Sequence, residues 1–375
     1  MPVSIIHTAD WQIGKQFANI PGDAGAMLRE QRFHTVRRIA DVARERAVDA
    51  VLVAGDVFDS NAVKDETVRR TIKALEGFAG PWVLLPGNHD AALAESVWTR
   101  IERWGNAAKL VLATSREPIV LANGGMVVLP APLRHKQEAV DLTEWFDAAE
   151  TPAAAVRIGL AHGSVAGRLP EQAEAKNPIA EDRADRARLD YLALGDWHGT
   201  RQIGPRTWYA GTPEPDRWKE NDPGNVLLVN IQEPGGQPSV ERITVGHFHW
   251  RLLEASVHSR PDIEMLDAGL RDFGIPAERL VVALRLKGAI GLATRLVLDD
   301  MLEQWRAYVR YLEVSDADLI AQPSEEDLDR ISRGDFIRAA VDRLRARADD
   351  PGDVASDAAR LALRILYVEH VRTGA

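Results

Sequence analysis

The sequence contains no cysteine among its 375 residues, which excludes disulfide bonds and thiolate metal ligands. Any bound metal must therefore be held by histidine, carboxylate, amide or water ligands. The sequence also has no apolar run approaching the roughly 18 residues that a membrane-spanning helix needs. Its first residues, 1–6, lack the basic segment that precedes the apolar stretch of a signal peptide. These absences lead us to expect a cytoplasmic protein with no membrane partner.

The sequence also lacks an excess of basic residues, and its formal net charge is −10. An acidic chain is a poor general match for nucleic acid, which counts against an autonomous protein that binds DNA tightly. A nuclease is still allowed, since bound divalent ions would cancel several carboxylates and a partner could supply most of the DNA contacts. The composition is 45% hydrophobic and 27% charged, which suits a globular protein of two or three domains.

Five short apolar segments before residue 200 share one pattern: each has the length of a buried strand, ends at Gly or Ala, and precedes a polar side chain able to bind metal. The segments are 5–9, 50–55, 82–87, 158–161 and 191–195. Predicted helices at 28–47 and 65–78 separate the first three, so we expect parallel strands. Ligand sites in such sheets lie at the carboxyl ends of the strands, which should bring together six side chains: Asp10, Asp56, Asn88, His162, Asp196 and His198.

These residue types indicate a particular chemistry. Asp, Asn and His are suitable ligands for Mn, Fe, Mg or Zn, and a central carboxylate can bridge two cations. Two metals about 3.5–4 Å apart can activate a water and hold both oxygens of an in-line phosphoryl displacement. Glycines beside the ligands should let the backbone turn sharply and leave room for substrate. The pattern is therefore consistent with a two-metal phosphoesterase.

The motifs carry a family resemblance. The strings Gly55-Asp56-Val57-Phe58-Asp59, Gly87-Asn88-His89-Asp90 and Asp196-Trp197-His198, with His162 between the last two, resemble those of calcineurin-like metallophosphoesterases. The segments 7–11 and 209–213 look specifically like the SbcD branch, the nuclease component of SbcCD DNA-processing complexes. The resemblance covers roughly residues 1–248. It implies an α/β fold, a four-layered calcineurin-like sandwich.

The resemblance also implies roles for individual residues. Asp10 and His198 would bind the first metal, Asp56 would bridge both metals, and Asn88 and His162 would bind the second.

His89 matches the family's histidine that is not a ligand but stabilises the transition state or protonates the leaving oxygen. Asp90 is expected to orient the His89 imidazole, because a carboxylate fixes the tautomer and direction of a histidine ring.

Two positions depart from the family pattern. Gln12 stands where the first motif usually has His, and Asp196 stands where the last motif usually has His. We expect both to be metal ligands, Gln12 through its carbonyl oxygen, although Gln12 could equally lie outside the ligand shell. The resulting oxygen-rich site favours two Mn ions, with Mg as the alternative, over Zn. The extra negative charge also lowers the Lewis acidity of the metals, so the activity could be weakened, retuned or lost.

The second half of the chain contains few metal-ligand residue types. Strand and helix patterns alternate as β-α-β-α-β over 250–315, and the resemblance implies a capping domain that shapes a DNA groove. A turn-rich linker at 321–324 precedes two amphipathic helices. Their apolar positions are Phe336, Ile337, Ala340, Val341, Leu344, Leu361, Ile365 and Val368. These helices either pack on their own chain or, as in the family, dock on the coiled coil of an SbcC-like SMC-family ATPase.

The resulting prediction has three domains: a nuclease domain at 1–248, a capping domain at 249–316 and a helical partner-binding region at 324–375. The predicted activity is metal-dependent hydrolysis of DNA phosphodiester bonds, by exonuclease or endonuclease action, in DNA repair and recombination. A homodimer is expected by family analogy only. Two alternatives stay open: a stand-alone phosphodiesterase or phosphatase for small molecules, and a catalytically weak scaffold that recruits an ATPase to DNA ends.

Overall fold

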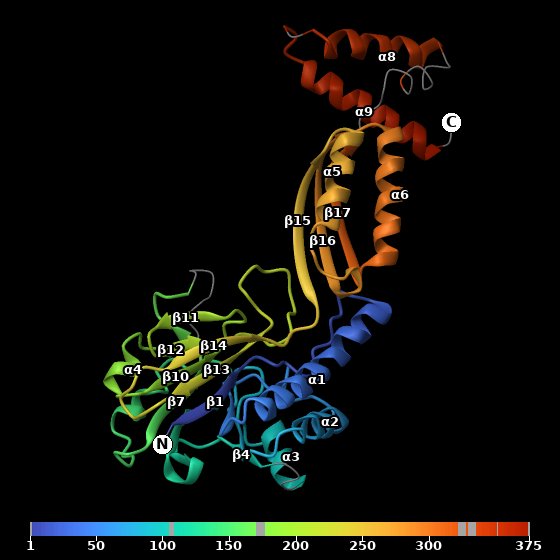
Figure 1. Cartoon of the computed structure of the whole chain (residues 1–375). Coiled ribbons are helices and arrows are strands. Elements are labelled where there is room, and N and C mark those ends of the chain that lie inside the picture. The colour runs from blue at the N-terminus through green and yellow to red at the C-terminus, as the bar shows by residue number, and fades with distance from the viewer. Residues whose placement is uncertain are drawn as a thin grey trace. The chain divides into compact units, whose positions relative to one another are not determined.

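The chain divides into two compact units, Met1–His249 and Trp250–Ala375. The computed structural model describes residues 2–104, 109–169, 177–321, 328, 335–350 and 352–373 (Figure 1). Within these ranges no helix is long and apolar enough to cross a membrane.

The first unit contains two six-stranded sheets. The strand order of the first sheet is β14-β13-β1-β2-β3-β4. Strands β1 to β4 are parallel neighbours, whereas β13 runs antiparallel to both β1 and β14. The bounds are β1 Val3–Thr8, β2 Ala50–Val53, β3 Trp82–Leu84, β4 Leu110–Leu112, β13 Asn225–Ile231 and β14 Ser239–Thr244.

The second sheet has the order β11-β12-β10-β7-β6-β5. Its four central strands are parallel neighbours. The outer strands are antiparallel to the strands beside them, β5 to β6 and β11 to β12. The bounds are β5 Ile119–Leu121, β6 Met126–Ala131, β7 Val156–His162, β10 Tyr191–Gly195, β11 Arg201–Gly204 and β12 Thr207–Tyr209. A separate two-stranded ladder pairs β8 Ser164–Val165 with β9 Pro178–Ile179.

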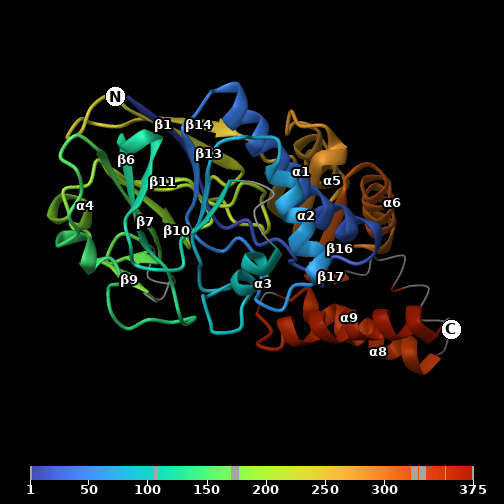
Figure 2. The same cartoon turned by 90° about the horizontal axis from the view of Figure 1, so that it is seen from below.

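Three apolar cores separate four layers in this unit. Helices α1 Gly22–Glu45, α2 Asp65–Leu75 and α3 Val97–Trp104 cover the outer face of the first sheet, and α1 and α2 run side by side (Figure 2). A second core lies between the two sheets. The third lies on the far face of the second sheet, under the short helices η2 Glu144–Asp147 and α4 Arg183–Arg186. This helix–sheet–sheet–helix arrangement confirms the predicted four-layered sandwich.

The predicted elements of this unit are present with small shifts in their bounds. All five ligand-bearing segments form strands, and the predicted parallel pairing is found within each sheet. Helix α1 begins at Gly22, ahead of the predicted residue 28, because its first turn holds small and acidic residues that show no apolar period.

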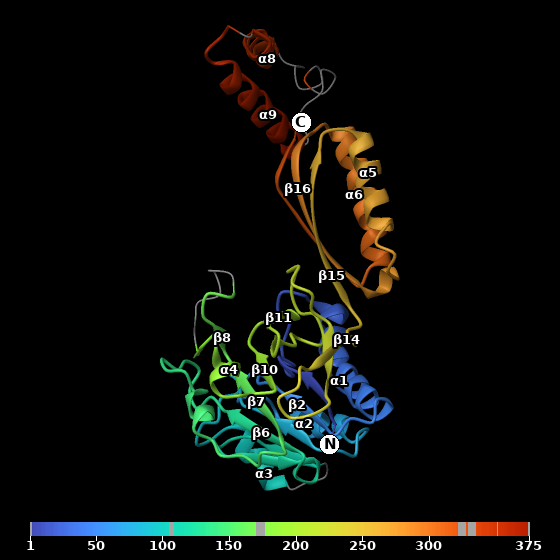
Figure 3. The ribbon, with the colours of Figure 1, turned by 60° about the vertical axis from the view of Figure 1, so that its left-hand side comes forward.

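The second unit confirms the predicted β-α-β-α-β order. Strands β15 His249–Val257, β16 Leu280–Ile290 and β17 Tyr311–Ala321 form a sheet in that order, with β16 and β17 parallel. Helices α5 Arg260–Arg271 and α6 Leu292–Tyr308 cover one face of it (Figure 3), and η3 Ala277–Arg279 precedes β16. Strand β17 extends beyond residue 316, where we placed the end of the capping domain.

Two helices, α8 Asp335–Ala348 and α9 Ser356–Thr373, form the predicted hairpin. They share a small core of Val341, Ala348, Ala359 and Leu363 together with Leu328. Ile337, Leu361 and Ile365 are exposed, the last two at 54% and 56%. The predicted linker residues 322–324 and the side chains of Phe336 and Val368 lie outside the described residues.

Candidate metal centre

The site lies at the carboxyl ends of five central strands. Asp10 follows β1, Asp56 follows β2 and Asn88 follows β3 in the first sheet. In the second sheet His162 is the last residue of β7, and Asp196 follows β10. Because the two sheets face one another across a shared core, the turns after these strands meet in one place.

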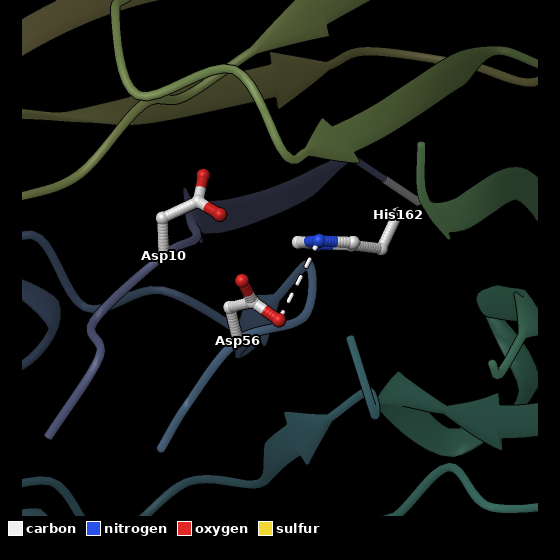
Figure 4. A group of neighbouring side chains, drawn as sticks. All are labelled: Asp10, Asp56 and His162. Carbon is white, nitrogen blue, oxygen red and sulfur yellow. Dashed lines mark ion pairs between the residues drawn. The ribbon is translucent and has the colours of Figure 1, made fainter. Parts of the chain in front are cut away.

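Asp10, Asp56 and His162 form the centre of the site. Each offers one ligand atom, and these atoms all lie within 4.8 Å of one another. Figure 4 shows the two carboxylates and the imidazole pointing toward a common space. Nε2 of His162 lies 3.5 Å from Oδ1 of Asp56, and all three side chains are buried.

Other predicted ligands contact this group directly. Nε2 of His162 lies 2.7 Å from Oδ1 of Asn88 and 3.7 Å from Oδ1 of Asp196. The backbone N–H of Asp196 donates to the Asp10 carboxylate, with distances of 3.2 and 3.3 Å to its two oxygens. Ser164 donates to the other oxygen of the Asp196 carboxylate at 2.9 Å. The structure therefore shows the predicted convergence for five of the six residues: Asp10, Asp56, Asn88, His162 and Asp196.

The donor set fits a divalent cation. Nδ1 of His162 donates to the carbonyl oxygen of Ala54 at 2.8 Å, so Nε2 is the nitrogen that faces the carboxylates. Burial by itself would lower the pKa of His162, but the carboxylates of Asp56, Asp10 and Asp196 raise it to about 9. Burial raises the pKa of Asp10 to about 6. Buried carboxylates that face one another are costly, and a bound cation would relieve that cost.

The turns that carry the ligands have unusual backbone conformations. Asp10, Gln12, Asp56 and Asp196 all have positive φ, at 53°, 44°, 52° and 100°. Non-glycine residues rarely adopt this region, and such strain concentrates at functional sites. The turns after β1 and β2 are joined by hydrogen bonds from Asp10 N to Gly55 O and from Gln12 N to Asp56 O.

The glycines beside the ligands confirm one of their two predicted roles, since Gly55 turns the backbone at a φ of 88°. We expected them to leave room for substrate, but a Cβ added at Gly87 would overlap the Asp56 carboxylate. A Cβ added at Gly55 would likewise overlap the His162 ring. These glycines therefore make room for neighbouring ligand residues, not for substrate.

Gln12 is near the centre but is not oriented as a ligand. Its carbonyl oxygen accepts a hydrogen bond from Lys15 Nζ at 3.2 Å, and its amide nitrogen lies 3.2 Å from Nε2 of His198. An amide nitrogen has no lone pair to give to a metal. In this structure Gln12 therefore forms hydrogen bonds beside His198 and Lys15.

The expectation that Asp90 orients His89 is also corrected. Nδ1 of His89 bonds instead to the carbonyl oxygen of Asp59 at 2.9 Å. The buried Asp90 carboxylate accepts from the backbone N–H groups of Phe58 and Gly87 at 2.9 and 2.7 Å. Asp90 therefore holds the turn that carries Asn88 and His89, whereas a carbonyl group directs the imidazole.

Sequence reasoning missed an ionic cluster around Asp216. This buried carboxylate lies 3.2 Å from Nδ1 of His198, accepts from Arg217 Nε at 2.9 Å and pairs with Lys15. Arg32, which is buried in α1, lies 3.8 Å away. Despite burial, His198 and the two arginines hold the pKa of Asp216 well below its usual range. Asp216 lies in a loop without a recognisable motif, so only the fold reveals its contact with His198.

A cavity of about 360 Å³ opens beside the metal centre. Asn88, Asp196 and His198 contribute to its wall. Among the described residues the remaining wall is mostly polar or basic: Lys136, Gln137, Ser164, Asn177, Trp197, Arg217, Lys219 and Asn221.

The fold and the site together define a metal-dependent phosphoesterase. Residues 3–251 match the model of the calcineurin-like phosphoesterase family, and the chain belongs to that family. The family predicted from the motifs is therefore confirmed, and its members are hydrolases that use divalent metals.

Three relatives illustrate where the chain stands within the family. It is 24% identical over 81% of its length to the uncharacterized metallophosphoesterase YhaO of Bacillus subtilis, of which it covers 73%. It is 24% identical over 64% of its length to SbcD, the D component of the nuclease SbcCD of Escherichia coli, of which it covers 68%. It is 22% identical over 71% of its length to the DNA double-strand break repair protein Mre11 of Methanosarcina acetivorans, of which it covers 43%.

Proposed function

We propose that the protein is a two-metal nuclease that hydrolyses phosphodiester bonds in DNA. The observation that carries this proposal is the buried group of Asp10, Asp56 and His162, whose ligand atoms lie within 4.8 Å of one another. Asn88 and Asp196 adjoin it. The DNA substrate is supported by similarity to the SbcD component of the nuclease SbcCD and to the DNA double-strand break repair protein Mre11.

The residues present would divide between two metal sites. Asp10 and His198 would hold one metal with Asp196 beside them, Asn88 and His162 would hold the other, and Asp56 would bridge. The oxygen-rich donor set favours Mn, with Mg as the alternative. When bound, the two ions would activate a water and offset the charge that develops on the phosphoryl oxygens.

His89 is the residue we assign to proton transfer. Its side chain is 39% exposed, and Nε2 lies 3.8 Å from Oδ2 of Asp56 at the edge of the site. Because Nδ1 bonds to the Asp59 carbonyl oxygen, Nε2 faces the place where a leaving oxygen would lie. Asp90 acts as a positioning residue through its hydrogen bonds to the same turn.

A second candidate function is a phosphodiesterase for small molecules. The cavity of about 360 Å³ favours it, since this volume lies within the range of small-ligand pockets. A substrate of that kind would need neither the second unit nor the α8–α9 hairpin.

The helical hairpin supports an ATPase partner. Leu361 and Ile365 are four residues apart in α9, so they lie on one face, and both are exposed. Such a pair suits docking into a groove of a coiled coil. We propose an SbcC-like SMC-family ATPase as the partner, in accordance with the name of the SbcCD relative. A homodimer is proposed by analogy with the SbcD branch.

The test uses the full chain with linear single-stranded and double-stranded DNA and with bis-p-nitrophenyl phosphate, each with Mn or with EDTA. His89→Ala and Asp56→Ala are compared with His135→Ala and Asp65→Ala, which change exposed side chains. Mn-dependent DNA cleavage that only the first two variants lose would support the nuclease. Cleavage of the small ester alone would favour the second candidate. Absence of all activity would contradict both.

A further inference from the structure

The cavity beside the metal centre differs in charge from the rest of the protein. The formal net charge of the chain is −10, yet the described lining residues include three cations, Lys136, Arg217 and Lys219, and one carboxylate, Asp196. That carboxylate belongs to the metal centre. The remainder of the wall is therefore a local positive region beside a site built for a phosphate ester.

The loop that carries Arg217 and Lys219 is fixed in place. Its carboxylate Glu214 accepts from Thr35 Oγ1 at 2.6 Å and from the backbone N–H groups of His247 and Phe248 at 3.0 and 2.9 Å. The Arg217 guanidinium is held by Asp216. These contacts tie the loop to α1 and to the segment after β14.

The two lysines reach the cavity from different loops. Lys219 Nζ lies 4.4 Å from the centre of the Trp197 ring, a cation–π contact that keeps the ammonium group beside the cavity wall. Lys136 lies in the loop after β6, where buried Asn177 accepts a hydrogen bond from Glu138 N at 2.7 Å. Both cations are thus presented by ordered backbone, which lowers the entropic cost of binding an anion.

We propose that this cavity is a subsite for a second phosphate of the substrate, one that is bound but not hydrolysed. Lys136 and Lys219 are its main cations, and Arg217 adds a third while it also holds Asp216. The ligand class is a nucleotide unit with its own phosphate, joined to the phosphodiester at the metal centre. Asn88, Asp196 and His198 also line this cavity, so its volume of about 360 Å³ would hold such a unit together with part of the ester at the metal centre.

This subsite rests on the proposed phosphodiesterase activity, and it has a consequence for substrate choice. A diester with an additional terminal phosphate should be preferred over the same diester without it. Charge-assisted hydrogen bonds to a phosphate are among the stronger polar contacts, so the preference should be at least about tenfold in kcat/KM. Such a preference also favours unpaired ends, where a nucleotide can leave the stack.

The experiment compares two chromogenic substrates, thymidine 5′-(p-nitrophenyl phosphate) and the same ester with a 3′-phosphate, with Mn present. A second, isomeric pair has the reactive ester at the 3′ position and the extra phosphate at the 5′ position. It tests whether the nucleotide binds in the reverse direction between the metal centre and the subsite. Lys136→Gln/Lys219→Gln is compared with Lys64→Gln/Lys73→Gln, whose exposed lysines lie at α2 away from the cavity. Arg217 is left unchanged because it supports Asp216 and His198.

In one of the two pairs, we expect kcat/KM to be about tenfold higher with the extra phosphate than without it, both for the wild type and for the α2 double variant. For the cavity double variant the two kcat/KM values should be nearly equal. Hydrolysis of all esters without any preference would overturn the subsite and leave the phosphodiesterase intact. Hydrolysis of none of these esters, together with no cleavage of DNA, would overturn the proposed function itself.

A binding measurement separates the subsite from catalysis. Anisotropy of a fluorescein-labelled single-stranded oligonucleotide, measured in EDTA over a range of salt concentrations, reports phosphate contacts without turnover. Loss of two contacts should reduce the slope of log K against log salt by roughly 1.4. The same slope in wild type and in the cavity double variant would overturn the proposal.

Discussion

Oδ1 of Asp216 lies 3.2 Å from Nδ1 of His198, and the two side chains are joined in a buried ionic cluster. In the tautomer in which Nδ1 donates to this carboxylate, Nε2 keeps its lone pair, which faces the Gln12 amide nitrogen 3.2 Å away and which a bound metal would take. Partners of this kind set the tautomer and raise the basicity of a histidine ligand. Replacing Asp216 by Asn should therefore weaken metal binding by roughly 10–100-fold, as measured by calorimetric titration with Mn.

The same substitution should also destabilise the fold. Asp216→Asn leaves the buried Arg32 and the nearby Lys15 without their anion, which should lower the free energy of unfolding by about 3 kcal/mol. Asp65→Asn, at an exposed ion pair, serves as the control. Unchanged metal affinity in folded Asp216→Asn would show that the carboxylate has only a structural role.

Gly87 is required because of the position of Asp56. The substitution Gly87→Ala should displace Asp56, destabilise the protein by about 1–3 kcal/mol and reduce Mn affinity. Gly204→Ala is the matched control, because nothing lies within 4 Å of a Cβ added there. Thermal unfolding and Mn titration of both variants measure the effect. Full Mn affinity in Gly87→Ala would contradict the close approach of this turn to Asp56.

Asp56 should contribute little to the stability of the metal-free protein, although hydrolysis by the metal-bound protein should require it. Burial, and next the charge of Asp56, raise the pKa of Asp90 to about 8. The lost repulsion with Asp90 opposes the lost attraction to the His162 imidazole, so in EDTA Asp56→Asn should change the melting temperature by no more than roughly 2–4 °C. With Mn, hydrolysis should fall at least about a hundredfold. A large fall of the melting temperature in EDTA would show that Asp56 stabilises the fold.

His7 provides a prediction for pH dependence. It is buried between the Tyr191 hydroxyl, 2.9 Å from Nδ1, and the Leu194 carbonyl oxygen, 3.2 Å from Nε2. Burial lowers its pKa from 6.5 to about 3. Below pH 6.5 the unfolded chain therefore binds a proton that the folded protein does not, so stability falls as the pH falls from 6.5 toward 3.

Urea unfolding of the wild type and of His7→Gln, in EDTA at pH 7 and pH 5, measures this effect. The unfolding free energy of the wild type minus that of His7→Gln should be about 2 kcal/mol smaller at pH 5 than at pH 7. Asp10 and Asp90 titrate with the opposite sign in this range, but both proteins contain them, so their effects cancel in the difference. If this difference is the same at both pH values, the lowered pKa of His7 is refuted.

The local sequence pattern alone determined much of the fold and the centre of the site. Short apolar segments that end at glycine and a ligand residue predicted the strands, their parallel pairing and the convergence of Asp10, Asp56 and His162. This succeeds because a parallel sheet places the ends of its strands along one edge. The alternation of strands and helices after residue 249 likewise follows from apolar periodicity.

The partners of each side chain were decided only by the tertiary structure. The sequence could not show that the Asp59 carbonyl oxygen, not the Asp90 carboxylate, bonds to His89, or that Lys15 donates to the Gln12 carbonyl oxygen. It gave no sign that Asp216, in a loop more than two hundred residues after Gln12, lies beside His198. Hydrogen bonds act over about 3 Å between groups that folding brings together. Their identity therefore depends on how the two sheets pack, which no local pattern encodes.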